Sequence, residues 1–157
     1  MSPQYSGELR KKIDEVIARY PKKEAALLPV LHLVQNEVGF VSPEEEKYVA
    51  QALGIKPIRV REVVTFYTMI LLRPFGRYHV QVCSNLSCHL AGSGKLIDYL
   101  KGKLGIGVGE TTADMKFTLS AVECLGACEQ SPCMMVNFDY YGQLDKDKID
   151  QILDRLV

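Results

Sequence analysis

The chain of 157 residues carries 19 lysines and arginines against 19 aspartates and glutamates, so its formal net charge is zero, and 47% of its residues are hydrophobic. This length and composition suffice for one or two small domains with a real core and no stabilising disulfides. Zero net charge argues against nucleic acid or an anionic membrane as the main partner, because both favour a basic surface.

The termini and the apolar runs predict a chain that stays in the cytoplasm. Residues 1–7 are polar and lack the apolar stretch of a signal peptide. The longest apolar run, residues 63–72, is interrupted by threonines and is shorter than the roughly 20 residues of a membrane span. We therefore expect no direct membrane insertion. In a reducing compartment the five cysteines are metal ligands or redox groups rather than a disulfide framework.

The first half of the chain begins with two predicted helices. Apolar residues recur at helical spacing over residues 9–20, Ser6 precedes them as a cap and Pro21 follows them as a stop. Residues 24–38 are apolar nearly all round, which predicts a helix buried on every face. Pro29 lies within this segment, so the helix is expected to be kinked or to start late.

Two further helices are predicted before the chain changes character. The tetrapeptide Ser-Pro-Glu-Glu at residues 42–45 is a strong start signal for a third helix, and residues 59–69 form a fourth. Its aromatic and methionine side chains either pack in a core or contact a partner. Core packing is favoured for Phe66, and both interpretations stay open for Tyr67 and Met69.

The second half predicts a small α/β sandwich. The predicted strands cover residues 78–82, 116–123 and 134–138, and the predicted helices cover residues 94–104 and 145–156. The dipeptide Tyr141-Gly142 suggests a hairpin turn into a brief fourth strand. The first two strands are expected to be parallel, because a helix connects them. The break between the two halves falls near residues 73–76.

Four of the five cysteines form two pairs, and each pair follows a predicted strand. Cys83 and Cys88 follow the first strand, and Cys124 and Cys128 follow the second. Neighbouring parallel strands place the loops after them side by side, so these four thiolates are expected to meet. Four thiolates at one point bind zinc or an iron–sulfur cluster.

The spacing of the cysteines favours a [2Fe–2S] cluster without deciding for it. Neither pair is the C-x2-C knuckle of zinc sites, whereas a C-x4-C spacing occurs in plant-type [2Fe–2S] proteins. A structural zinc module, a dithiol switch and unrelated buried thiols remain alternatives. A thioredoxin-type enzyme is disfavoured because no C-x-x-C is present.

Residues around the two pairs have supporting interpretations. Cys133 is interpreted as a small buried hydrophobic residue, with a substitute ligand as the alternative. Gly92 and Gly126 lack a Cβ, so their backbone N–H groups are expected to approach sulfur and donate hydrogen bonds. The histidines are interpreted as packed or loop residues rather than ligands: His32, His79 and His89.

The chain resembles the 24 kDa-type [2Fe–2S] subunit of NADH:quinone oxidoreductase, respiratory complex I, in the thioredoxin-like ferredoxin family. Nearly the whole chain takes part, through the run Val-Glu-Cys-Leu-Gly-Ala-Cys at 122–128 and through residues 28–35, 63–67, 83–92 and 105–112. Members usually have a plain apolar residue in place of Cys133 and Asp-Gly in place of Asp114-Met115.

The resemblance implies an α+β or α/β fold, with a helical bundle for partner docking over residues 1–75 and a thioredoxin-like [2Fe–2S] ferredoxin domain over residues 76–157. It implies that the cluster ligands are Cys83, Cys88, Cys124 and Cys128.

The resemblance also implies a partner. This is a larger flavoprotein subunit that carries FMN, the NADH site and a [4Fe–4S] cluster, and the complex lies peripherally on the inner face of the membrane. The chain would exchange one electron with the flavin and catalyse nothing alone. The same kind of chain occurs in NAD-linked formate dehydrogenases and in bidirectional or bifurcating hydrogenases, which stay alternatives. A free-standing ferredoxin dimer is disfavoured by the helical first half.

Overall fold

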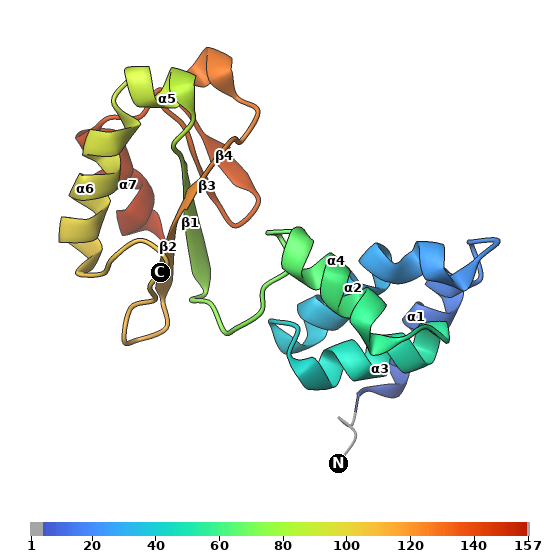
Figure 1. Ribbon diagram of the computed structural model, residues 1–157. Helices are drawn as coiled ribbons and strands as arrows, with labels where there is room; N and C mark the ends of the chain where they lie inside the picture. The colour runs from blue at the N-terminus through green and yellow to red at the C-terminus, as the bar shows by residue number, and fades with distance from the viewer. Residues whose placement is uncertain (1–4, 157) are drawn as a thin grey trace. The chain divides into compact units, whose positions relative to one another are not determined.

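The chain divides into two compact units, Met1–Pro74 and Phe75–Val157, in a computed structural model that describes residues 5–156 (Figure 1). Most of the polar segment at residues 1–7 lies outside the described residues. Within residues 5–156, no helix has both the length and the apolar character needed to cross a membrane.

The first unit is helical, as predicted. Its elements are α1 (Gly7–Ile17), the 3-10 turn η1 (Lys23–Ala26), α2 (Leu27–Val38), α3 (Pro43–Leu53) and α4 (Pro57–Phe66). Ser6 caps α1 by accepting a hydrogen bond from the Leu9 backbone N–H at 3.1 Å. The predicted start of α3 is a capping box, in which the Glu45 carboxylate accepts from the Ser42 backbone N–H at 3.0 Å. Buried apolar side chains of all four α-helices form one core.

Two expectations about this unit are corrected. Helix α2 starts late, after η1, and buries one face rather than its whole circumference, since Leu28 and Leu33 are only half-buried. Helix α4 ends at Phe66, because Tyr67 adopts an extended backbone conformation. Phe66 is 77% exposed and does not pack in the core, and Met69 follows the helix instead of belonging to it.

The second unit is a four-stranded sheet with helices against it. Its elements are β1 (Tyr78–Cys83), α5 (Leu86–Leu90), α6 (Ser93–Leu104), β2 (Phe117–Val122), η2 (Cys128–Gln130), β3 (Met134–Val136), β4 (Asp139–Tyr141) and α7 (Lys146–Arg155). The strand order is β2-β1-β3-β4, with β1 parallel to β2 as predicted and the other pairs antiparallel.

Helices α6 and α7 lie side by side against this sheet (Figure 1). The Asp150 carboxylate of α7 accepts hydrogen bonds from the Tyr99 hydroxyl at 2.6 Å and the Lys103 ammonium at 2.7 Å, both on α6. Apolar side chains of these helices pack on the strands in a core of their own. The helices leave the ends of β1 and β2 available for the loops that carry the cysteines.

Two details of the second unit differ from the sequence prediction. The hairpin turn lies at Asn137 and Phe138, before β4, and not at Tyr141-Gly142. Asn137 makes this turn possible because it adopts a positive φ of 54°, which asparagine tolerates better than most residues. The short helix α5 was not predicted, since five residues give too little periodicity for detection.

Candidate metal centre

Strands β1 and β2 bring the two cysteine segments to one edge of the sheet. Cys83, the last residue of β1, lies opposite Val122, the last residue of β2. The pairing continues one step further, because the Ser84 backbone N–H donates to the Val122 carbonyl at 2.8 Å. The loops that follow both strands therefore start side by side, as the sequence predicts for neighbouring parallel strands.

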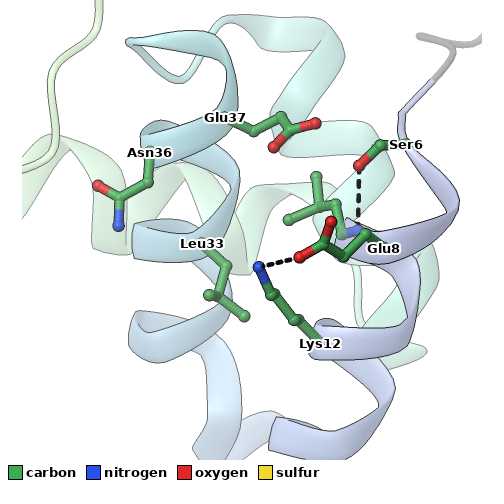
Figure 2. Close-up of a pocket in the computed structure, with 7 residues that line it drawn as sticks. Ser6, Glu8, Lys12, Leu33, Asn36 and Glu37 are labelled. Atoms are coloured by element: carbon green, nitrogen blue, oxygen red, sulfur yellow. Dashed lines mark hydrogen bonds and ion pairs between the residues drawn. The ribbon is translucent and has the colours of Figure 1, made fainter.

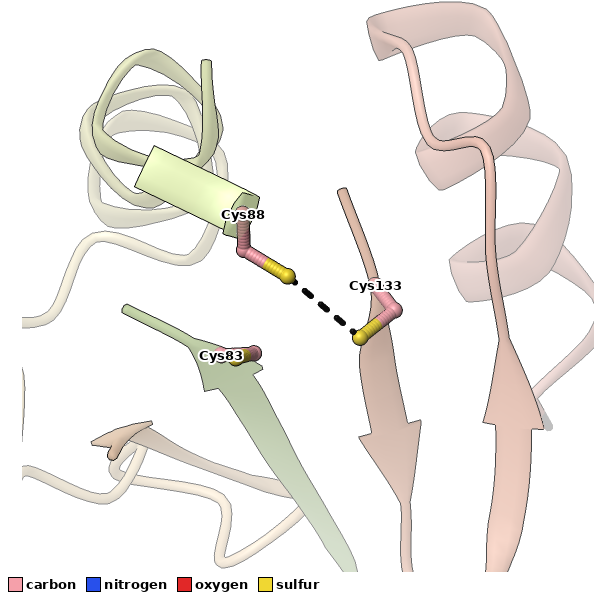
Figure 3. Close-up of side chains that lie close together, drawn as sticks. All are labelled: Cys83, Cys88 and Cys133. Atoms are coloured by element: carbon pink, nitrogen blue, oxygen red, sulfur yellow. Dashed lines mark hydrogen bonds between the residues drawn. The ribbon is translucent and has the colours of Figure 1, made fainter. Parts of the chain in front are cut away.

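Three thiols meet at this edge, and one of them was not expected there. The Sγ atoms of Cys83, Cys88 and Cys133 all lie within 4.8 Å of one another. Cys88 and Cys133 point toward one another at 3.6 Å, beside Cys83 at the end of β1 (Figure 3). Each of the three residues is at most 3% exposed. The burial expected for Cys133 is confirmed, and its contact with Cys88 is new.

Local structure holds these thiols in place. Cys88 lies on α5, whose start is capped by Asn85 through a hydrogen bond from the Leu86 backbone N–H at 2.7 Å. Cys133 directly precedes β3, and its carbonyl accepts from the Cys83 backbone N–H at 3.1 Å. The position of Cys133 one residue before an apolar strand that pairs with β1 was the only sequence signal for this contact.

The second pair of cysteines is placed differently. Cys124 and Cys128 are exposed, whereas Leu125 and Ala127 between them pack against the three buried thiols. The loop therefore lies over the thiol group with its two cysteines outside it. The Gly126 backbone N–H donates to the Cys124 sulfur at 3.3 Å, so at least this thiol already has the kind of donor that a thiolate needs.

The expected role of the two glycines is partly wrong. A Cβ placed on Gly126 would meet nothing within 4 Å, so close approach is not what requires glycine there. The requirement is its positive φ of 71°. The Gly92 backbone N–H donates to the His89 carbonyl at 3.0 Å instead of to sulfur. Gly92 has a φ of 98° and provides the turn from α5 into α6.

The surroundings favour a thiolate at Cys88 over one at its neighbours. Burial raises the pKa of the Cys83 thiol. Burial also acts to raise the pKa of Cys88, but hydrogen bonds from the Ser131 hydroxyl and the Cys133 backbone outweigh it, so this pKa is lowered. Burial and the hydrogen bond with Cys88 raise the pKa of Cys133 to about 12. In the metal-free chain Cys133 is therefore the proton donor of its pair with Cys88.

The donor set fits a [2Fe–2S] cluster. Such a cluster needs four cysteine thiolates, and the two loops supply Cys83 with Cys88 and Cys124 with Cys128 at one sheet edge. Backbone N–H groups of Asn85 and Leu125 face the Cys83 sulfur, which offsets the negative charge of bound thiolates.

The histidines are not part of this group. His79 is packed in β1, with its Nε2 atom 2.8 Å from the Ser120 hydroxyl and its ring 4.6 Å from that of Phe75. Burial lowers the pKa of His79 to about 4. The packed, hydrogen-bonded role predicted for His79 is confirmed.

The first unit has a surface pocket that does not compete with the cysteines as a functional site. It lies between α1 and α2, has a volume of about 300 Å³ and is shown in Figure 2. Its charged groups Glu8 and Lys12 are exposed and pair with each other at 2.7 Å. An ion pair of this kind on one helix is a surface feature, so the cysteine edge is the better candidate.

Comparison with known proteins agrees with this chemistry. The family model for thioredoxin-like [2Fe-2S] ferredoxin matches residues 13–157. An E-type chain of the NADH-quinone oxidoreductase of Rhizobium meliloti (strain 1021) is 46% identical over 93% of this chain and 87% of its own length. The E-type chain of the NADH-quinone oxidoreductase of Rickettsia conorii (strain ATCC VR-613 / Malish 7) is 45% identical over 91% of this chain and 87% of its own length.

A solved structure shows the same fold. The crystal structure of NAD+-reducing [NiFe]-hydrogenase in the air-oxidized state matches with a TM-score of 0.73 and 23% identity, over 83% of this chain and 22% of that chain. At this identity the likeness concerns the fold alone. The match of the family model over most of the chain and the identity to both relatives confirm the resemblance seen in the sequence. The chain belongs to the thioredoxin-like [2Fe–2S] ferredoxin family.

Proposed function

We propose that the chain is an electron-transfer subunit of an NADH:quinone oxidoreductase, with a [2Fe–2S] cluster held by Cys83, Cys88, Cys124 and Cys128. The observation that carries this proposal is the pairing of β1 with β2, which starts both cysteine loops side by side in a member of a [2Fe–2S] family. The names of the two bacterial relatives support the assignment to this kind of complex.

The residues of the chain have distinct roles in this proposal. When bound, the cluster supplies a one-electron carrier. Cys83 and Cys88 anchor it on the buried side, where water is excluded. Backbone N–H groups of Asn85, Leu125 and Gly126 face two of the sulfurs and favour the extra negative charge of the reduced state, which raises the reduction potential.

The partner in this proposal is a flavoprotein subunit that binds FMN and NADH and carries a [4Fe–4S] cluster. Hydride chemistry belongs to nicotinamide and flavin, so this chain needs no catalytic acid or base of its own. Cys124 and Cys128 are exposed on the second unit, as are Leu86 and Leu90 on α5, at 68% and 77%. Exposed apolar side chains beside a redox site are typical of a surface that a partner covers. The complex would place the chain in the cytoplasm, peripheral to the membrane.

The test is an EPR spectrum of the full chain, purified anaerobically and reduced with dithionite, beside assays of iron, sulfide and zinc. We expect two irons and two sulfides per chain and the signal of one unpaired electron, as a [2Fe–2S] cluster requires. The Cys124→Ser variant is expected to lose or strongly alter this signal, and the Cys133→Ser variant is expected to keep it.

The contrary result is equally clear. A colourless, EPR-silent protein that takes up zinc but no iron after anaerobic reconstitution with iron and sulfide would leave a structural zinc module. A signal that is lost in Cys133→Ser but kept in Cys124→Ser would overturn the proposed ligand set.

A further inference from the structure

We propose that Cys83, Cys88 and Cys133 form a binding site for a single zinc ion in the cluster-free chain. Zinc at this site and the [2Fe–2S] cluster would exclude one another, because both need Cys83 and Cys88. The exclusion rests on the proposed function, whereas the zinc site rests only on the three thiols. Cys133 distinguishes the two centres, since it belongs to the zinc site and not to the proposed cluster ligands.

The distances between the thiols suit one ion. Zinc–sulfur bonds are about 2.3 Å long, so two thiolates on one tetrahedral zinc lie about 3.8 Å apart. Cys88 and Cys133 are already 3.6 Å apart, and all three sulfurs lie within 4.8 Å of one another. Three sulfurs in mutual contact match a mononuclear site, whereas a [2Fe–2S] cluster divides its ligands between two irons.

The surroundings of the three thiols suit a buried charged site. Three thiolates and one Zn²⁺ carry a net charge of −1, which needs hydrogen-bond donors when it is buried. The backbone N–H groups of Asn85 and Leu125 face Cys83, and that of Cys133 faces Cys88. The Ser131 hydroxyl lies 3.5 Å from the Cys88 sulfur, so this hydroxyl or a water is available near a fourth coordination position.

Zinc binding here is a ligand exchange without electron transfer. Each thiol that binds gives up its proton to the solvent and forms one Zn–S bond, so up to three protons leave per ion. The lid over the site is the loop that carries Cys124 and Cys128, through Leu125 and Ala127. This loop lies at the surface and must lift to admit the ion, whereas the three ligands are already in place.

The experiment uses the full-length chain after anaerobic removal of the cluster under reducing conditions. Zn²⁺ is titrated against a chromophoric chelator, and Co²⁺ is used in parallel because its absorption bands report the number of thiolate ligands. We expect one zinc per chain. Loss of a ligand costs at least as much as loss of a supporting contact, so Cys133→Ser should weaken zinc binding roughly 10- to 100-fold or more. Cys133→Ala is a second variant, and both must keep the wild-type circular dichroism.

The matched controls are Cys124→Ser and Cys128→Ser. They remove a proposed cluster ligand but no zinc ligand, so they should leave the zinc affinity within about threefold of wild type, well below the loss of a ligand. If they weaken zinc binding as much as Cys133→Ser does, or if Cys133→Ser changes nothing, the three-thiol site is refuted.

The exclusion is tested by reconstitution with iron and sulfide. Bound zinc should slow the appearance of the reduced EPR signal in the wild type and have much less effect in Cys133→Ser. An equal effect in both would overturn the exclusion. A chain that never takes up a cluster, but binds one zinc in a manner that depends on Cys133, would refute the proposed function and support the zinc site.

Discussion

The backbone N–H of Gly126 donates a hydrogen bond to Sγ of Cys124 at 3.3 Å, and a φ of 71° at Gly126 makes this possible. An alanine at this position would have open space for its Cβ but an unfavourable backbone. We expect Gly126→Ala to cost about 1 kcal/mol in stability. We also expect it to lower the reduction potential of the cluster, because the N–H donor to sulfur is displaced. Potentiometric EPR titration and urea unfolding measure the two effects.

Gly105→Ala is the matched control for this prediction. Gly105 has a φ of 66° and equally open space, but it ends α6, and its backbone N–H donates to the Lys101 carbonyl rather than to sulfur. The control should lose similar stability and keep the wild-type potential. A shift of potential in Gly105→Ala as large as that in Gly126→Ala would mean that strain, and not the hydrogen bond, affects the cluster.

Gly76 is required for a different reason, which is contact with the neighbouring backbone. A Cβ at this position would lie 2.7 Å from the carbonyl carbon of Phe117 in β2. Backbone atoms cannot rotate away, so Gly76→Ala should destabilise the chain by about 1–3 kcal/mol, as overpacking does. Gly102→Ala, on the exposed surface of α6 with nothing within 4 Å, should instead stabilise it by about 0.5–1 kcal/mol. Urea unfolding followed by circular dichroism distinguishes the two, and equal midpoints would contradict the prediction.

Arg61 neutralises a buried carboxylate in the first unit. Its Nη1 atom donates to Glu46 Oε1 at 2.6 Å, and the Glu46 side chain is only 7% exposed. Arg61→Met keeps much of the apolar stem but leaves this carboxylate without its cation, so we expect a loss of about 2 kcal/mol.

Arg59→Met is the control for Arg61→Met. Arg59 pairs with Glu62 at 2.5 Å, but both side chains are more than half exposed, so the loss should stay below about 1 kcal/mol. Thermal unfolding of both variants measures the difference. Equal destabilisation would show that burial of Glu46 does not govern the strength of its pair.

His79 makes the stability of the chain depend on pH. Its folded-state pKa is lowered from 6.5 to about 4 by burial. Between these two values the unfolded chain binds a proton that the folded chain excludes, so stability falls as the pH falls through this range. Between about pH 7 and about pH 5 the loss should be about 1 kcal/mol, which allows for the partial exposure of the ring.

The comparison is with His79→Gln, which keeps a polar group beside Ser120 but cannot be protonated. This variant should lose less stability than the wild type over the same range in urea unfolding, because only the common carboxylate contributions remain. An identical pH dependence of the two proteins would show that His79 does not carry this term.

Local signals explain which parts of the structure could be predicted. Ser42, Pro43 and Glu45 act on one another within a single turn, so the capping box and the start of α3 could be found from the sequence. The change from helical to strand periodicity predicted the helical first half and the parallel pair β1 and β2. The C-x4-C and C-x3-C segments follow these strands directly, so their place at one sheet edge followed from topology.

The tertiary structure alone decided how the thiols are grouped. Cys133 is distant in the sequence from Cys83 and Cys88, and it joins them because β3 pairs with β1 on the side opposite to β2. No local period encodes which strands become neighbours, since that depends on the packing of α6 and α7 on the whole sheet. The exposure of Phe66 was likewise decided by where α4 ends and what packs on it. The sequence by itself determined the elements and the chemistry of their ends, and long-range packing determined which of these ends meet.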